Sequence, residues 1–248
     1  MALVGLCVYA FRERRRTGGI LVLTLVGGSL CTFVEPFVDN LGKVWLRQEN
    51  AEILFTWLGR PMPVWVLPFT ALYWGGQVYL FYRLFQSRPT AKRFWSVYGV
   101  VLMSACLLEV PSTSLGLYDY FGNQPLNPTG YPLYWPFIYQ SGVLVAAALL
   151  HACPELFQGW KALRLVLLIP MAEIGFLTMT GLPIFIALHT EVSTGVATIA
   201  AFASIFMVIT IVSEVGRRVV GQGPVEAFRQ ADAPIDEAVR TRPEPART

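Results

Sequence analysis

Residues 196–215 read VATIAAFASIFMVITIVSEV, a run of 20 positions in which the single charged residue, Glu214, stands next to the end. A helix of about 20 apolar residues is long enough to cross the hydrocarbon core of a bilayer. Five more runs have the same character, at residues 20–38, 64–85, 94–110, 135–152 and 163–188. The pattern predicts an all-α fold, a polytopic transmembrane helix bundle of six full spans that is built by residues 1–220.

The overall composition agrees with a membrane protein. Of the 248 residues, 54% are hydrophobic and only 14% are charged, whereas a soluble domain usually carries about 25% charged residues. An ordinary soluble globular protein is therefore excluded, and the lipid bilayer is an expected partner. The net charge of +3 arises mostly from residues between the runs. This distribution reflects the orientation of the spans in the membrane, and no nucleic-acid partner is expected.

The two ends of the chain differ from the six runs. Residues 1–11 are apolar but too short to cross a bilayer, and arginines follow them, which is the reverse of the order in a secretory signal. Two interpretations stay open: the cytoplasmic end of a partial helix whose beginning is missing, and a tilted or interfacial stub. Residues 221–248 are rich in Pro, Ala, Arg and acidic residues without apolar periodicity. They predict a disordered cytoplasmic tail.

The orientation of the spans follows from lysine and arginine, which membrane proteins keep mainly on the cytoplasmic side. Alternate connections, with the run ends that border them and the tail, hold 16 of the 19 basic residues. The other connections hold only Lys43, Arg47 and Arg60. We therefore predict a multi-pass protein of the cell membrane whose basic connections and C-terminal tail are cytoplasmic. Residues 112–133 and 189–194, on the outer side, contain no lysine or arginine and are candidates for lining a mouth.

Acidic residues within the runs are the first candidates for function, because charged groups inside a membrane are costly. There are four of them, Glu35, Glu109, Glu173 and Glu214. Glu35 and Glu109 each lie 15 residues after the start of an outward run. At about 1.5 Å per residue, both are about 22 Å from the cytoplasmic end. Glu173 lies deeper in the membrane. Glu214 adjoins two arginines and is better explained as a member of a solvated ion pair.

Further polar residues fall near the depth of these two glutamates. Gln140 and Thr178 reach the same level, and Asp39 follows Glu35 by one helical turn if the helix survives the intervening proline. We predict a pocket in the outer half of the bundle with Glu35, Asp39 and Glu109 as its catalytic acid and base groups. The alternative is that the two glutamates are held by interhelical hydrogen bonds or reach the lipid headgroups.

Several other side chains are candidates for contacting a substrate, namely Tyr73, Trp74, Tyr118, Asp119, Tyr120, Gln140, Glu173 and Thr178. The aromatic ones could line an apolar pocket or stabilise a cation. A belt of aromatic residues at the membrane interface is the simpler explanation for most of them. No metal-ligand spacing, DDxxD run, P-loop or GxSxG motif is present. The sequence therefore indicates neither a metal nor another cofactor.

Several short motifs resemble one family of membrane proteins. They are EPFVDN at 35–40, LPF at 67–69 leading to YLF at 79–81, and LE at 108–109 followed by LGLYDY at 115–120. Over roughly residues 27–150 the chain resembles the AveC-like spirocyclase family of actinobacteria, which more often has Asp-Pro where this chain has Glu35-Pro36. The resemblance implies an integral membrane cyclase that closes a spiroketal on a polyketide. The stretch 109–120 is also similar to carotenoid hydratases and small membrane terpene cyclases.

Two classes of function are compatible with the sequence. The first is a membrane cyclase that transfers protons between carboxyl groups and a lipophilic small molecule, either polyketide-like or isoprenoid. Glu109 is the expected donor, because no basic residue lies near it in the sequence, and Glu35 is the expected acceptor. The second is a non-enzymatic carrier or accessory subunit whose acids bind a proton or a cation. The substrate and the oligomeric state stay open at this point.

Overall fold

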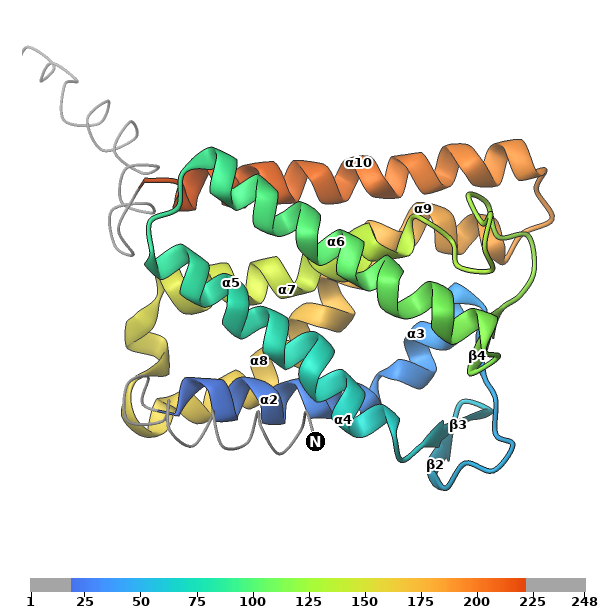
Figure 1. The fold of residues 1–248 in the computed structure, drawn as a ribbon, viewed down its shortest axis with the longest axis horizontal. Coiled ribbons are helices and arrows are strands. Elements are labelled where there is room, and N and C mark those ends of the chain that lie inside the picture. The colour runs from blue at the N-terminus through green and yellow to red at the C-terminus, as the bar shows by residue number, and fades with distance from the viewer. Residues whose placement is uncertain (1–18, 222–248) are drawn as a thin grey trace, which may run out of the picture.

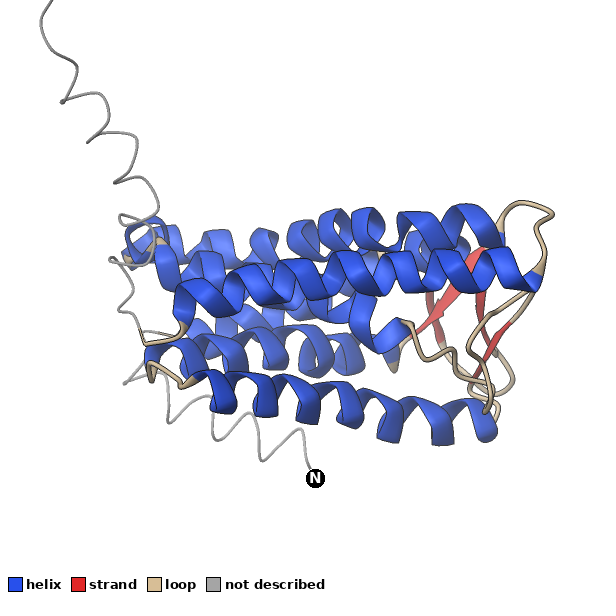
Figure 2. Ribbon diagram, turned by 90° about the horizontal axis from the view of Figure 1, so that it is seen from above, coloured by secondary structure: helices blue, strands red, loops and turns tan. Residues whose placement is uncertain are grey.

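The computed structural model describes residues 19–221, and this part of the chain is mostly helical (Figure 1). The long helices run side by side along the molecule, as two perpendicular views show (Figure 2). The α-helices are α2 (Ile20–Leu30), α3 (Glu35–Gly42), α4 (Val66–Thr70), α5 (Gln77–Gln86), α6 (Ala91–Ser114), α7 (Trp135–Ala152), α8 (Arg164–Ala172), α9 (Thr178–Leu188) and α10 (Thr194–Val219). The predicted N-terminal stub and, apart from its first residue, the predicted tail lie outside the described residues.

Shorter helical segments complete the bundle. Three are short 3₁₀ helices, η1 (Cys31–Phe33), η3 (Pro154–Phe157) and η4 (Gly159–Leu163). Two are π-helical, η2 (Ala71–Gly76) between α4 and α5, and η5 (Glu173–Leu177) between α8 and α9. π-Helical turns are rare and occur frequently at functional sites. Both therefore identify places where the regular packing of the bundle is modified.

Four helical segments of the described chain are long and apolar enough to cross a membrane. They are Ala91–Ser114, Trp135–Ala152, Gly159–Leu188 and Thr194–Val219, and a fifth would be Ile20–Phe33 with Glu35–Gly42, a pair bent by 54°. The structure thus supports four or five of the six predicted spans. The run at 64–85 does form a helical segment, α4–η2–α5, but its glutamine, arginine and tyrosine side chains make it less apolar than the others.

The first predicted run breaks at its proline. After η1 the chain bends and starts the short helix α3, with Pro36 in its first turn. Proline is tolerated there because the first N–H groups of a helix have no partner within the helix. Glu35 and Asp39 consequently lie on one helix, four residues apart and on the same face. The helix α3 packs against α9, so the bend directs this face into the bundle.

Helix α2 and the π-segment η2 approach each other at backbone contact. A Cβ added to Gly75 would lie 2.1 Å from the carbonyl oxygen of Thr24, and one added to Gly28 would lie 2.4 Å from the Gly75 nitrogen. Only glycine fits at such distances. The hydroxyl groups of Thr32 in η1 and Thr70 in α4, the segments that adjoin α2 and η2, form a 2.7 Å hydrogen bond. This close crossing determines where η2 places its aromatic side chains.

Two small β-sheets correct the all-α prediction. β1 (Val44–Leu46) pairs antiparallel with β4 (Tyr118–Tyr120), and β2 (Ile53–Trp57) pairs with β3 (Arg60–Pro63). All four strands lie at one end of the bundle (Figures 1 and 2). Runs of three to five residues are too short for alternation to be evident in the sequence. The β1–β4 pair joins the chain that follows α3 to the chain that follows α6.

The bundle has a central helix and more peripheral ones. Within α7, 78% of the span is buried inside the protein, against 28% in both α6 and α10. The outer faces of α6 and α10 expose large apolar side chains such as Leu107 (71%) and Phe206 (73%). In water, apolar surface of this extent would be costly to expose. These faces are compatible with contact to lipid.

Candidate functional site

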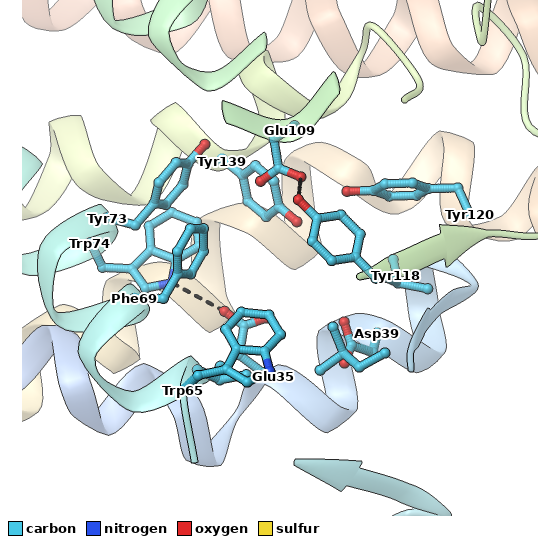
Figure 3. Close-up of a pocket in the computed structure, with 13 residues that line it drawn as sticks. Glu35, Asp39, Trp65, Phe69, Tyr73, Trp74, Glu109, Tyr118, Tyr120 and Tyr139 are labelled. Carbon is cyan, nitrogen blue, oxygen red and sulfur yellow. Dashed lines mark hydrogen bonds between the residues drawn. The ribbon is translucent and has the colours of Figure 1, made fainter. Parts of the chain in front are cut away.

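A cavity with a free volume of about 50 Å³ lies near the strand end of the bundle. It forms where α3, the α4–η2 segment, α6, α7 and the β1–β4 sheet meet (Figure 3). Its lining residues are Glu35, Asp39, Val44, Leu46, Trp65, Val66, Phe69, Tyr73, Trp74, Glu109, Tyr118, Tyr120 and Tyr139. The structure therefore brings the three predicted acid and base residues to a single cavity.

Two elements supply these three acids. Glu35 and Asp39 come from α3, on one side of the cavity, and Glu109 comes from α6, on the opposite side (Figure 3). Asp39 and Glu109 are buried, with 5% and 4% of their surface exposed. Burial in an apolar environment disfavours the ionised form of a carboxyl group, whereas a hydrogen-bond donor stabilises it. Glu35 and Glu109 each have one such donor.

Glu109 accepts a hydrogen bond from the Tyr118 hydroxyl (Figure 3). Tyr118 is buried in β4, only nine residues after Glu109, because the chain turns back at the end of α6. Burial, followed by the nearby Glu109 carboxyl, raises the pKa of Tyr118 far above its ordinary value. The phenol therefore stays protonated and serves as a donor. The hydrogen bond fixes Glu109 in the cavity wall.

Glu35 has a different donor. The indole Nε1 of Trp74 lies 3.2 Å from Glu35 Oε1 and donates to it (Figure 3). Trp74 belongs to η2, so the backbone crossing at Gly75 directly positions this donor. Glu35 is thus held by a hydrogen bond between two helical segments, as one of the two interpretations of the sequence expected, whereas the partner of Glu109 lies on a strand. Both glutamates also face the same cavity, as the other interpretation expected.

Aromatic rings form most of the remaining wall. Trp65, Phe69 and Tyr73 follow one another at four-residue spacing, which places them on one face of the α4–η2 segment. The rings of Phe69 and Tyr73 stack at 5.4 Å between centroids. The edge-to-face pairs Tyr73–Trp74 and Trp74–Tyr139 are 5.0 Å and 5.1 Å apart. None of the residues that line this cavity is lysine, arginine or histidine.

Asp119 lies outside the cavity lining, although the sequence suggested it as a contact to substrate. Its carboxylate forms a 3.0 Å ion pair with Arg47, and both side chains are about half exposed. Side chains alternate between the two sides of a strand. In β4, Tyr118 and Tyr120 therefore point to the cavity, and the residue between them points away.

Gln140, Glu173 and Thr178 also lie outside the lining. Gln140 is fully buried and donates a 2.7 Å hydrogen bond to Gln77. Glu173 is 2% exposed in η5, and Glu173 Oε1 and Thr178 Oγ1 have no hydrogen-bond partner among the described residues. Depth along a helix does not determine direction around it, because each residue turns the side chain by about 100°. Tyr139 lines the cavity, whereas its neighbour Gln140 faces α5.

Six lining residues are absent from the predicted site, namely Val44, Leu46, Trp65, Val66, Phe69 and Tyr139. The four-residue spacing of Trp65, Phe69 and Tyr73 is a sequence signal that extends the aromatic wall by two positions. No comparable signal exists for the β1 residues. Elsewhere, the predicted pairing of Glu214 is confirmed, because its carboxylate oxygens lie 2.6 Å from Arg217 and 2.7 Å from Arg218.

Comparison with known protein families, curated proteins and solved structures found no match to this chain. The fold and the cavity therefore carry the functional argument. They define a helical bundle with four or five apolar helices of membrane-spanning length and an acid-lined aromatic cavity near one end.

Proposed function

We propose that this chain is an integral membrane cyclase that acts on a lipophilic polyketide-like or isoprenoid substrate by proton transfer between carboxyl groups. One observation carries the proposal: Glu35 and Asp39 on one helix and Glu109 on another line the same aromatic cavity. Catalysis by an acid and a base needs a donor and an acceptor that both reach one bound molecule. The resemblance to spirocyclases rests on residues 35–40, 67–69, 79–81, 108–109 and 115–120, and each of these stretches except 79–81 contains a lining residue.

The proposed roles follow from the sequence, in which no basic residue lies near Glu109, since both glutamates accept one hydrogen bond. Glu109, protonated in its apolar surroundings, is the general acid and Tyr118 orients it. Glu35, whose ionised form the Trp74 indole stabilises, is the general base, with Asp39 one turn away. Closure of a spiroketal from a dihydroxyketone releases one water, and cyclisation of a polyene releases nothing. Neither reaction changes the oxidation state of the substrate, so neither needs a cofactor.

A metabolite comparison tests the enzymatic role. Cells of the producing strain are compared with a strain whose gene carries the double change Glu35→Gln and Glu109→Gln. We expect the double variant to accumulate a lipophilic precursor that is 18 mass units heavier than the lost product for a spiroketal, or isomeric with it for an isoprenoid. A strain with Glu214→Gln, an acid far from the cavity, is the control. Identical lipophilic extracts from all strains would favour a carrier or accessory role instead.

The proposed topology has six spans, in which α4–η2–α5 crosses the membrane together with the five more apolar candidates. The basic residues place Ser87 and Gln158, in the connections after α5 and α7, in the cytoplasm. Asn123, between β4 and α7, is expected outside. Fusions of alkaline phosphatase and of green fluorescent protein at the three positions measure this directly. Phosphatase activity at Ser87 or Gln158 would contradict the orientation.

A further inference from the structure

We infer that the cavity recognises positive charge, so that its substrate is a lipophilic molecule whose reacting end becomes an oxocarbenium ion or a carbocation in the cavity. The inference rests on the proposed function, which it deepens by naming the chemical class of the bound species. It is carried by the distribution of charged groups and ring faces around the three acids.

The cavity contains acidic groups without basic ones. Three carboxyl groups line it and no lysine, arginine or histidine does. Arg60 extends from β3, where its Nε donates to Asn40 Oδ1 at 3.2 Å and its guanidinium lies over the Trp45 ring at 5.0 Å. Arg47 is paired with Asp119 at the surface. A phosphate, sulfate or carboxylate placed in this cavity would meet three carboxyl groups and no cationic side chain in the lining. The apolar wall would strengthen the repulsion from any of these carboxyl groups that is ionised.

The aromatic rings of the wall also favour a bound cation. An aromatic ring has a negative face, which attracts a cation within about 6 Å of its centroid. Trp65, Phe69, Tyr73, Trp74 and Tyr139 form a continuous set of rings between the two acidic sides of the cavity (Figure 3). Trp135 lies behind Tyr139 and stacks on it at 4.8 Å, which restricts the motion of that ring. The ring positions are therefore set before a ligand binds.

The size of the cavity restricts what is recognised. A free volume of about 50 Å³ is enough for a small group and far too little for a whole polyketide or isoprenoid chain. The charge-selective part of the site therefore holds the reacting end of the substrate. The rest of the chain extends beyond the cavity.

Charge is conserved in the reaction: Glu109 loses one proton, Glu35 gains one, and in spiroketal closure one water leaves. The protonated Glu109 transfers its proton to a leaving oxygen or to an alkene carbon and becomes a carboxylate. The substrate carries the resulting positive charge between the ring faces and the acids of α3. When the new ring bond forms, Glu35 takes the proton that the attacking hydroxyl or the adjacent carbon releases. Both carboxylates thus face the cation at the moment when its charge is greatest.

A pair of probes that differ by one atom and one charge tests the inference. Benzyltrimethylammonium carries a permanent cation, and neopentylbenzene has the same shape with carbon in place of nitrogen. Binding to the full-length protein in lipid nanodiscs is followed by tryptophan fluorescence, with empty nanodiscs as the blank. We expect the ammonium probe to bind at least tenfold more tightly than the neutral one. Phenylacetate, an anion of similar size, is expected not to bind.

Variants assign this preference to the cavity. The double change Glu35→Gln and Asp39→Asn is expected to weaken ammonium binding at least tenfold, and Glu214→Gln is expected to leave it unchanged. Size-exclusion profiles test whether each variant is folded. The comparison of the probes uses the unmodified protein, so it does not depend on how the variants fold. Equal binding of the neutral isostere, or measurable binding of phenylacetate, would overturn the inference while the metabolite comparison still tests the proposed function. Selective ammonium binding without any precursor or product would support charge recognition and refute the cyclase.

Discussion

Replacing Glu109 by glutamine is expected to lower product formation by about 10² to 10⁴ fold, which is the usual contribution of a general acid. Glutamine has nearly the same shape, and its carbonyl oxygen still accepts the hydrogen bond from Tyr118. It cannot transfer a proton as a carboxylic acid does. The amount of folded protein in the membrane should therefore stay close to that of the unmodified chain. Product is measured by mass spectrometry of lipid extracts and normalised to protein level.

Two companion variants separate catalysis from structure. Tyr118→Phe keeps the carboxyl group but removes its hydroxyl donor, so we expect a smaller loss than for Glu109→Gln. Glu214→Gln changes an acid in a surface ion pair and should leave product formation unaffected. Unchanged turnover in Glu109→Gln would remove this residue from the mechanism. Loss of protein together with activity would mean that Glu109 serves the packing of α6.

Replacing Gly75 by alanine is expected to destabilise the bundle strongly, because the added methyl carbon would lie 2.1 Å from the Thr24 carbonyl oxygen and 2.8 Å from the Leu25 Cα. These are backbone atoms, so α2 as a whole has to move. Overpacking of this kind typically costs about 1–3 kcal/mol, occasionally more. The same shift displaces Trp74 and with it the hydrogen bond to Glu35. Both the melting temperature and product formation should fall.

The adjacent glycine provides a matched control. A Cβ added to Gly76 meets no atom within 4 Å, although Gly76 lies in the same π-helical segment. Alanine is favoured over glycine in helices by about 1 kcal/mol, so Gly76→Ala is expected to be neutral or slightly stabilising. Thermal unfolding of the detergent-solubilised proteins, followed by size-exclusion chromatography, compares the two variants. Equal melting temperatures would show that α2 and η2 are not in backbone contact.

Helix positions in this protein could be predicted closely from the sequence. The apolar run at 135–152 coincides with α7, and the runs at 94–110 and 196–215 lie within α6 and α10. A continuous apolar stretch bounded by polar residues leaves few alternatives to a helix in which every backbone hydrogen bond is satisfied internally. The strands were not predicted, because three to five residues give too short a pattern. The bend before Glu35 was indicated by the following proline, but its direction was not.

The candidate site, like the fold, has features that the sequence predicts and features that only the structure shows. Depth along a straight helix follows from the constant rise per residue, and on this basis the sequence predicts equal depths for Glu35 and Glu109. The structure bends the first run by 54° between Phe33 and Glu35, so the rise counted from Ile20 does not give the depth of Glu35. The direction in which a side chain points around the helix axis matters only relative to neighbouring helices. It therefore depends on contacts between segments that are distant in the sequence. Gln140 and Thr178, which the sequence predicts at the same level, do not line the cavity. Tyr139 lines it, although nothing in its own run distinguishes it from an interfacial tyrosine.

What the sequence determined by itself is therefore the set of apolar helices, their order and the acidic residues within them, because hydropathy and helical rise act locally along the chain. Only the tertiary structure decided that α3 turns its acids inward, that β4 presents Tyr118 and not Asp119, and that η2 directs Trp74 to Glu35. These outcomes depend on which surfaces pack against each other. The close contact of Gly28 and Gly75, between residues far apart in the chain, is the clearest case.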